Sequence, residues 1–291
     1  MAASRLARVL VTMLCAAVAV PAMPAAAQQG QQPQQGQKQY EPEVGQAGKD
    51  VVWVPTSDAL VEKMLDLAEV TAKDYLIDLG SGDGRTVIAA AKRGARAHGI
   101  EYNPDMVALS KKNAEAAGVS DRATFEKADL FEADFSKATV ITMFLLPSIN
   151  MKLRPTLLEL KPGTRIVSNT FTMEDWEADE TATASEGCTS WCNALLWIVP
   201  ARVQGTWQTP QGRLRITQTF QTVSGSLNSS GTTTAITGKL RGDQITFTAG
   251  KRQYTARVNG NTLEGTVTAA DGQAQPWKAT KVVATSGTPR P

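Results

Sequence analysis

The sequence has few of the residues that build metal sites. Its 291 residues contain one histidine, His98, and three cysteines. A metal site of histidine or cysteine ligands is therefore not expected, and His98 is interpreted as a packing residue of a strand. Lysine and arginine number 30 and aspartate and glutamate 28, giving a formal net charge of +2. This near balance gives no whole-chain argument for nucleic acid as a partner.

The stretch from Tyr75 to Arg85 is the most informative part of the chain. A short apolar run that contains Asp78 opens into glycines at positions 80, 82 and 84. Because glycine lacks a Cβ, the backbone there can take positive φ values and come close to a ligand. Residues 86–93 have helical composition, and Gly94 is placed to end the helix. Strand, loop and helix together predict the first half of a nucleotide-binding βαβ unit.

The glycine spacing decides between nucleotide classes. The dinucleotide fingerprint G-x-G-x-x-G needs its third glycine at position 85, where this chain has Arg85. A nicotinamide-dependent oxidoreductase is therefore disfavoured. A second acid, Glu101, follows about 20 residues after the loop, the separation that one strand-helix-strand unit requires. A glycine turn of purely structural use is the alternative, and the spaced acid argues against it.

The amino terminus predicts export. Two arginines precede an uncharged apolar run over residues 9–27 that ends in three alanines. This pattern is typical of a secretory signal peptide over residues 1–27, which places the mature protein in the periplasm or outside the cell. The alternative is a protein anchored in the membrane by the uncleaved segment, because the run is just long enough to span a bilayer. Two prolines inside the run disfavour this alternative.

A linker and an α/β domain are predicted next. Residues 28–50 are rich in glutamine, glycine and proline at their start, which predicts a disordered linker. Residues 51–200 alternate strand and helix patterns, which predicts an α/β doubly wound, Rossmann-like domain closed by an antiparallel hairpin. The expected strands are 75–79, 96–101, 123–127, 139–146, 165–170 and 194–199, and the expected helices are 57–70, 86–93, 104–117 and 149–160.

Residues 201–285 have a different texture. They are rich in threonine, glycine and glutamine and contain short alternating strands, such as 214–220. Gly242-Asp243 and Asn259-Gly260 are hairpin signals, and no helix pattern is present. We expect a small antiparallel β domain, either a barrel or a sandwich, with Trp207 and Trp277 as core residues rather than as a stack for a ligand.

Cys188 and Cys192 are the only cysteines that follow the predicted signal peptide. In an oxidising compartment they form either a disulfide or two free buried thiols. Residues four apart on one strand are too distant to bridge, so a disulfide requires a turn at Thr189-Ser190-Trp191.

The order D-x-G-x-G-x-G from Asp78 to Gly84 resembles the first motif of class I S-adenosylmethionine-dependent methyltransferases. The resemblance implies S-adenosylmethionine as the cofactor and a seven-stranded sheet. In this family the acid and the glycine turn hold the methionine end, the next acid binds both ribose hydroxyls, and a later acid accepts from the adenine amino group. The implied cofactor-binding residues are Asp78, Gly80, Ser81, Gly82, Glu101, Tyr102, Asp129 and Leu130.

Residues 51–180 resemble a narrower family, the protein-lysine methyltransferases that modify the c subunit of ATP synthase and the adenine nucleotide carrier. The resemblance rests on Val54-Pro55-Thr56, the glycine motif, Gly99-Ile100-Glu101, Phe144-Leu145-Leu146-Pro147 and the run from Lys161 to Ser168. It implies that Phe144, Leu145 and Pro147 lie near the methyl acceptor. Amino-N-methyltransferases with Asn/Asp-Pro-Pro-Tyr after the fourth strand match less well.

These observations leave two functions open. The first is a methyltransferase that acts on a nitrogen, most simply a protein lysine, although the acceptor could be a protein or a small molecule. The second is an exported protein that binds an adenosyl compound without transferring a methyl group. Methyl transfer from a sulfonium needs alignment more than acid-base groups, so the lack of a catalytic cluster does not exclude an enzyme. No catalytic residue, metal or oligomeric state is predicted.

Overall fold

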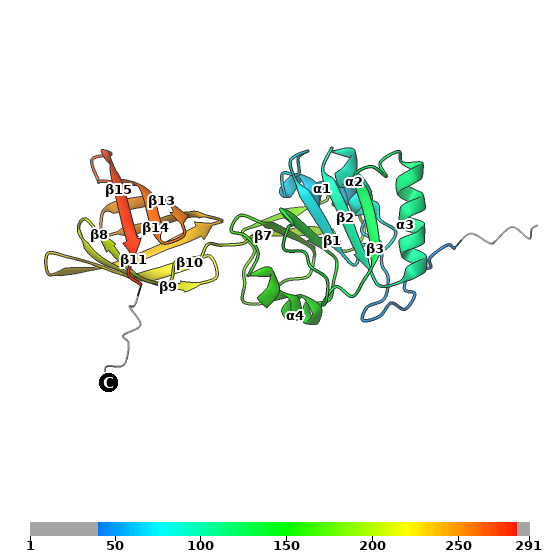
Figure 1. Cartoon of the computed structure of the whole chain (residues 1–291), viewed down its shortest axis with the longest axis horizontal. Helices are drawn as coiled ribbons and strands as arrows, with labels where there is room; N and C mark the ends of the chain where they lie inside the picture. The colour runs from blue at the N-terminus through cyan, green and yellow to red at the C-terminus, as the bar shows by residue number, and fades with distance from the viewer. Residues whose placement is uncertain (1–39, 284–291) are drawn as a thin grey trace, which may run out of the picture. The chain divides into compact units, whose positions relative to one another are not determined.

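The computed structural model describes residues 40–283, so the predicted signal peptide and residues 28–39 of the predicted linker lie outside the described residues. The described residues form two sheets, one of seven strands and one closed into a barrel (Figure 1). Among them, no helix is long and apolar enough to cross a membrane.

Strands and helices alternate in the first part, as predicted. The elements are α1 (Asp58–Leu67), β1 (Tyr75–Leu79), α2 (Arg85–Lys92), β2 (Arg96–Glu101), α3 (Pro104–Ala116), β3 (Ala123–Lys127), β4 (Val140–Met143), α4 (Pro147–Leu157), β5 (Arg165–Asn169), β6 (Glu180–Thr183) and β7 (Asn193–Ile198). The strand order is β3-β2-β1-β4-β5-β7-β6, with β7 antiparallel to both neighbours. The predicted seven-stranded α/β sheet is confirmed.

The two faces of the sheet are covered by different layers (Figure 1). Alternation along β1 sends Leu76 into the core beneath α1, α2 and α3 and Ile77 into the core on the opposite face. That second core contains α4 together with Phe135 and Trp176 from the loops. Because both faces are buried, the central strands are apolar almost throughout, which is the pattern that the sequence displayed.

The fourth strand is shorter than predicted. The apolar run continues to Leu146, but β4 ends at Met143 and α4 begins at Pro147. Leu145 is buried although it lies outside the sheet, because it packs in the core that contains α4, whereas Leu146 is exposed. Apolar residues in the segment after β4 therefore extended the run that was interpreted as strand.

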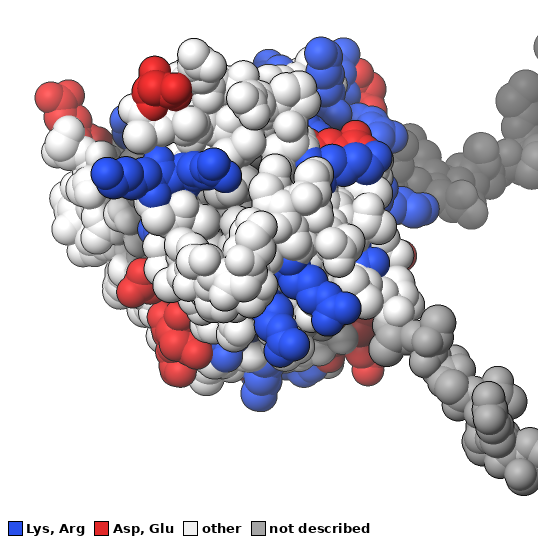
Figure 2. Space-filling model, turned by 90° about the vertical axis from the view of Figure 1, so that its left-hand side faces the viewer, with Lys and Arg blue, Asp and Glu red and all other residues white. Residues whose placement is uncertain are grey.

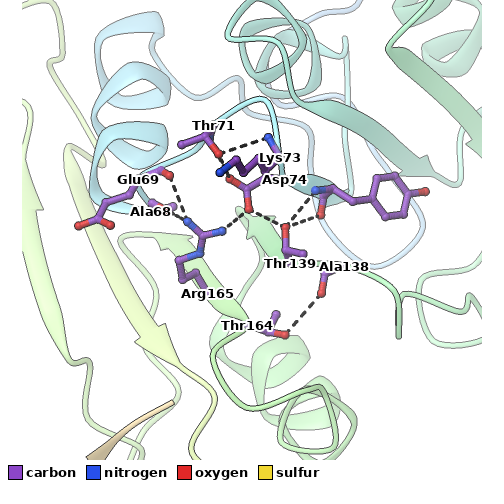
Figure 3. Close-up of polar contacts among 10 residues, drawn as sticks. Ala68, Glu69, Thr71, Lys73, Asp74, Ala138, Thr139, Thr164 and Arg165 are labelled. Carbon is purple, nitrogen blue, oxygen red and sulfur yellow. Dashed lines mark hydrogen bonds and ion pairs between the residues drawn. The ribbon is translucent and has the colours of Figure 1, made fainter. Parts of the chain in front are cut away.

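A polar cluster around the buried Asp74 joins the amino-terminal ends of three strands (Figure 3). The carboxylate of Asp74, just before β1, accepts hydrogen bonds from the Thr71 backbone and from the Thr139 hydroxyl, 2.8 Å each. It is also paired with Arg165 at the start of β5, whose guanidinium donates to backbone carbonyls after α1. Side chains thus fix the amino-terminal ends of these strands, and their carboxyl-terminal ends are free for a ligand.

The second part is an up-and-down barrel of short strands. Its strands are β8 (Gly205–Thr209), β9 (Gly212–Thr219), β10 (Thr222–Ser229), β11 (Thr232–Arg241), β12 (Gln244–Ala249), β13 (Arg252–Asn259), β14 (Thr262–Thr268) and β15 (Ala274–Lys281). Pairing of β15 with β8 closes the sheet. Of the two predicted architectures, the structure has the barrel.

The barrel is filled by aromatic rings. Phe247 and Tyr254 stack with ring centroids 4.6 Å apart, and the ring of Trp277 packs edge-on against both. Trp207 is fully buried and donates its indole N–H to the carbonyl of Val203 at 2.8 Å. Both tryptophans that the sequence assigned to the core are therefore core residues.

Candidate functional site

A pocket of about 280 Å³ lies where the parallel strands of the seven-stranded sheet end. The carboxyl ends of such strands are the usual ligand site of an open α/β sheet. Its lining includes all eight predicted cofactor residues, which are Asp78, Gly80, Ser81, Gly82, Glu101, Tyr102, Asp129 and Leu130, as well as Phe144 and Leu145. Pro147, the first residue of α4, does not line the pocket.

The glycine loop needs Gly82 for two reasons. Its φ is +54°, in the left-handed region that residues with a Cβ rarely adopt. A Cβ at this position would lie 2.6 Å from Nε1 of Trp53, another pocket residue. A side chain at position 82 would therefore strain the backbone and intrude on the pocket wall.

Glu101 at the end of β2 is held by the loop that it faces. One carboxylate oxygen accepts from the backbone N–H of Gly82 and the other from that of Asn103, both at 2.9 Å. A carboxylate has about four acceptor positions, so each oxygen keeps capacity for one further donor. Two adjacent hydroxyl groups, such as those of a ribose, match this remaining capacity.

Asp78 lies deeper in the pocket than Glu101. The pKa of its carboxyl is raised from 3.8 to about 7, mainly because of burial; a hydrogen bond from Thr142 lowers the pKa, and the negative charges of Glu101 and Asp83 raise it. The Thr142 hydroxyl donates to the carboxylate at 2.7 Å. A cationic ligand beside Asp78 would favour its ionised form.

Asp129 follows β3 and is already paired in this structure. Its carboxylate contacts the ammonium of Lys49 and accepts from the backbone N–H of Phe131 at 3.0 Å. The hydrogen bond from Lys49 is the largest cause that lowers the pKa of Asp129. Lys49 also lies over the ring of Tyr102, with its nitrogen 5.0 Å from the ring centroid.

Residues 46–56 form one side of the pocket. The sequence assigned residues up to 50 to the linker, yet Lys49 contacts Asp129 and the backbones of Ala47 and Val52 pair as an isolated bridge. Arg85 fixes the end of this segment, since it donates to the carbonyl of Thr56 at 2.8 Å. The same guanidinium also binds both carboxylate oxygens of Asp83. This segment borders the pocket at the side of the predicted cofactor residues.

The pocket has two chemically different halves. We call Asp78, Glu101 and Asp129 the carboxylate half, which comes from β1, β2 and the end of β3. We call Phe144, Phe171 and Trp191 the aromatic half, which comes from the loops next to β4, β5 and β7. In the sheet order these are two contiguous groups of strands. A charged ligand and an apolar one can therefore lie side by side in one cavity.

Sequence reasoning found Phe144 but missed Phe171 and Trp191. The ring of Phe144 stacks on that of Phe171 at 5.8 Å and lies 6.0 Å from the ring of Trp191. Phe171 and Trp191 lie in loops without a periodic pattern, so no periodicity points to them. One signal was available for Trp191, because it stands in the turn that a Cys188–Cys192 disulfide requires, and the structure contains that disulfide.

Comparison with known proteins gives consistent results for this part of the chain. The ANTKMT methyltransferase domain matches residues 78–180. A protein-lysine N-methyltransferase of Saccharolobus islandicus is 44% identical over 140 residues, which cover 47% of this chain and 87% of that protein. A Mus musculus lysine N-methyltransferase for the c subunit of ATP synthase is 37% identical over 130 residues, 44% of this chain and 52% of that protein. This chain thus spans about half the length of the mouse protein.

Among solved structures, an RNA methyltransferase from Salinibacter ruber in complex with S-adenosyl-L-homocysteine is 49% identical. The match covers 52% of this chain and 96% of that chain, with a TM-score of 0.48. The barrel lies outside the residues that the family model matches.

The pocket residues fit S-adenosylmethionine. Glu101 retains acceptor capacity for two hydroxyls, and the buried carboxyl of Asp78 suits a cationic group. The predicted enzyme class and cofactor are confirmed, and the alternative of a binding protein without transferase activity has no support in the comparisons. On the similarity to the Saccharolobus islandicus enzyme, this chain belongs to the S-adenosylmethionine-dependent protein-lysine N-methyltransferases.

Proposed function

We propose that this protein transfers a methyl group from S-adenosylmethionine to the ε-amine of a lysine in another protein. The observation that carries the proposal is the two-sided pocket, in which a carboxylate half suited to the cofactor adjoins an aromatic half without charged groups. This pocket lies in a chain that is 44% identical to a protein-lysine N-methyltransferase. Its acceptor protein is not implied by the names of its relatives.

S-adenosylmethionine supplies an electrophilic methyl carbon on a positively charged sulfur. Glu101 and Asp129 hold the nucleoside part, and Asp78 balances positive charge at the end that carries the methyl group. The aromatic half excludes water beside the reacting carbon and positions the amine for in-line attack, so most of the rate enhancement comes from alignment. No described residue of the chain needs to form a covalent bond.

The lysine must lose its proton before it attacks. The pocket residues next to β4, β5 and β7, which are Met143, Phe144, Leu145, Leu146, Ile149, Phe171 and Trp191, include no titratable group. Only the minor neutral form of a lysine amine can attack, because its ordinary pKa is about 10.4. The proton therefore leaves to solvent as the amine enters, and a general base from the chain is not required.

The test is methyl incorporation by the purified protein. Full-length protein, labelled cofactor and a membrane extract are incubated, and labelled proteins are digested and sequenced by mass spectrometry. We expect methyl groups on lysine residues, and no label when Glu101→Gln replaces the wild type. Tight cofactor binding without label in any extract or lysine peptide would contradict the proposal.

We propose further that the enzyme acts outside the cytosol. The apolar amino-terminal run predicts a signal peptide, and the Cys188–Cys192 disulfide supports an oxidising compartment. Mass spectrometry of the mature amino terminus tests this, with cleavage after Ala27 expected. An intact start in the membrane fraction would favour the anchored alternative, and an intact start in the cytosolic fraction would contradict export.

A further inference from the structure

Trp191 occupies an unusual position for a large apolar side chain. Its side chain is 46% exposed at the pocket mouth, and its backbone φ is +53°. The left-handed region is disfavoured for bulky residues and persists only where the surrounding structure imposes it. The disulfide between Cys188 and Cys192 closes a five-residue ring that contains Trp191, so the backbone at this residue is constrained from both sides.

A second residue in a strained conformation directly precedes Phe171, another aromatic residue of the pocket. Thr170, a β-branched residue, has a φ of +58° directly after β5. Its backbone N–H donates to the carbonyl of Asn193 at 2.7 Å, which ties the end of β5 to the start of β7, two residues after Trp191. Phe171 follows at once and stacks on Phe144. Two rare backbone conformations thus bring three rings to one side of the pocket.

The grouping of the rings suggests a ligand. Phe144 lies 5.8 Å from Phe171 and 6.0 Å from Trp191, measured between ring centroids, and all three side chains line the cavity. Aromatic faces carry negative potential and attract ammonium groups, tryptophan most strongly. Methyl transfer to an amine creates positive charge on the nitrogen, so rings at this place stabilise the transition state more than the neutral amine.

We propose that the disulfide-closed loop 188–192 is the outer wall of the acceptor site, with Trp191 binding the amine-bearing side chain of the acceptor lysine. This inference rests on the proposed function and deepens it. The ring of Trp191 contacts the aliphatic part of the lysine and its nitrogen as charge develops there. The disulfide is a positioning device that holds Trp191 toward Phe144. The family model ends at residue 180, so this wall lies outside the residues it matches.

The first test compares three substitutions of one residue. Trp191→Phe keeps an aromatic face, Trp191→Leu keeps only apolar bulk, and Trp191→Ala keeps neither. We expect kcat/KM for a lysine peptide to fall roughly tenfold in the leucine and alanine variants and less than about threefold in the phenylalanine variant. The Kd for S-adenosylmethionine should change less than about twofold in all three, because Trp191 belongs to the aromatic half.

The second test opens the ring without changing Trp191. The double variant Cys188→Ser, Cys192→Ser should show the same loss toward the peptide as Trp191→Leu, with cofactor affinity retained. Adding Trp191→Leu to the double variant should then cost little more, since the two changes act through one contact. Independent, additive losses, or equal activity of the leucine variant and the wild type, would overturn the proposal.

A third measurement does not depend on methyl transfer. Choline is titrated into the cofactor-loaded protein and compared with its neutral isostere, 3,3-dimethylbutan-1-ol, while the indole N–H signal that Trp191→Phe removes is followed by NMR. We expect choline to shift this signal at lower concentration than the alcohol. Equal shifts would overturn the aromatic-wall proposal. A shift with choline in a protein that methylates no lysine would contradict the proposed function but would still support a cation site at Trp191.

Discussion

In the carboxylate half of the pocket, the functional groups are held by hydrogen bonds, whereas in the aromatic half they are held by backbone constraint. Glu101 and Asp78 accept bonds from Gly82, Asn103 and Thr142. Phe171 and Trp191 instead follow or occupy left-handed positions, and a disulfide closes the loop of Trp191. Substitutions should therefore separate cofactor binding from acceptor binding almost completely.

Glu101 is expected to show the largest difference between the two halves in their effect on cofactor binding. Replacing Glu101 with alanine removes the acceptor for two backbone N–H groups and for the cofactor hydroxyls, so the cofactor Kd should rise roughly hundredfold. Phe144→Leu, in the other half, should change it less than about twofold. Isothermal titration of both variants measures this, and thermal melting verifies the fold. Equal losses in the two variants would mean that the halves are not separable.

The next effect is a pH dependence that belongs to Asp78 alone. Its pKa in the free protein is raised to about 7, and a cationic cofactor lowers it, so binding releases a proton below that pH. The Kd for S-adenosylmethionine should therefore fall by up to about tenfold per unit as the pH rises toward 7, and then level off. Asp78→Asn should flatten the profile and weaken binding at high pH. A slope unchanged by this substitution would assign the titration to another group.

The raised pKa of Asp78 has the opposite consequence for the unliganded protein, whose stability falls as the pH rises. Between its ordinary pKa of 3.8 and about 7, the unfolded chain has lost the Asp78 proton while the folded protein keeps it. The contribution of Asp78 to stability thus decreases as the pH rises through this window. Comparing urea midpoints of the wild type and Asp78→Asn at several pH values isolates the contribution.

Substitutions at two glycines, Gly82 and Gly118, test whether the cofactor comes close to the backbone at position 82. Gly82→Ala places a Cβ 2.6 Å from Trp53 at φ +54°, whereas Gly118→Ala meets open space at φ +69°. Backbone strain alone should cost about 1 kcal/mol of stability in both variants. Only Gly82→Ala should also weaken cofactor binding, by roughly tenfold. Equal cofactor affinity in the two variants would show that position 82 does not approach the ligand.

The smallest expected effect concerns Lys49. Lys49 forms an ion pair with Asp129, the predicted acceptor of a hydrogen bond from the adenine amino group. Because this ion pair is solvent-accessible, it contributes little free energy. Lys49→Ala should therefore tighten cofactor binding by less than about threefold. Lys73→Ala, which removes an exposed lysine outside the pocket lining, is the control. Tenfold weaker binding in Lys49→Ala would instead assign Lys49 to the binding of the cofactor.

The carboxylate half could be predicted from the sequence because its signals are local. Asp78 and Glu101 each stand at the end of an apolar run, and the glycines between them have a fixed spacing. The strand ends converge because parallel neighbours align their carboxyl termini, so two local patterns predict one site. The same logic predicted β1, β2 and β3 with the bounds that the structure has.

The aromatic half could not be predicted in the same way. Phe171 and Trp191 belong to loops, and their meeting depends on the pairing of β5 with β7, which the sequence does not specify. In the barrel, β10 was missed because serine, glycine and asparagine hide its alternation, although Val223 and Leu227 are buried. Long-range pairing, rather than propensity, decided both cases.

The two sheets also differ in charge. Residues 51–200 contain 15 basic and 22 acidic residues, whereas residues 201–285 contain ten basic and three acidic ones. The near-neutral total therefore conceals a net charge of −7 in one part and +7 in the other. On the face shown in Figure 2, lysine and arginine lie in several separate groups among uncharged residues. Such a diffuse excess attracts anionic partners at long range without specifying one.

Every strand of the barrel has a neighbour on both sides, and the sheet closes through two paired positions between β15 and β8. The centre is occupied by Phe247, Tyr254 and Trp277, which leaves the interior as structure rather than as a container. Side chains that point outward from the barrel can therefore change while this aromatic interior keeps its packing.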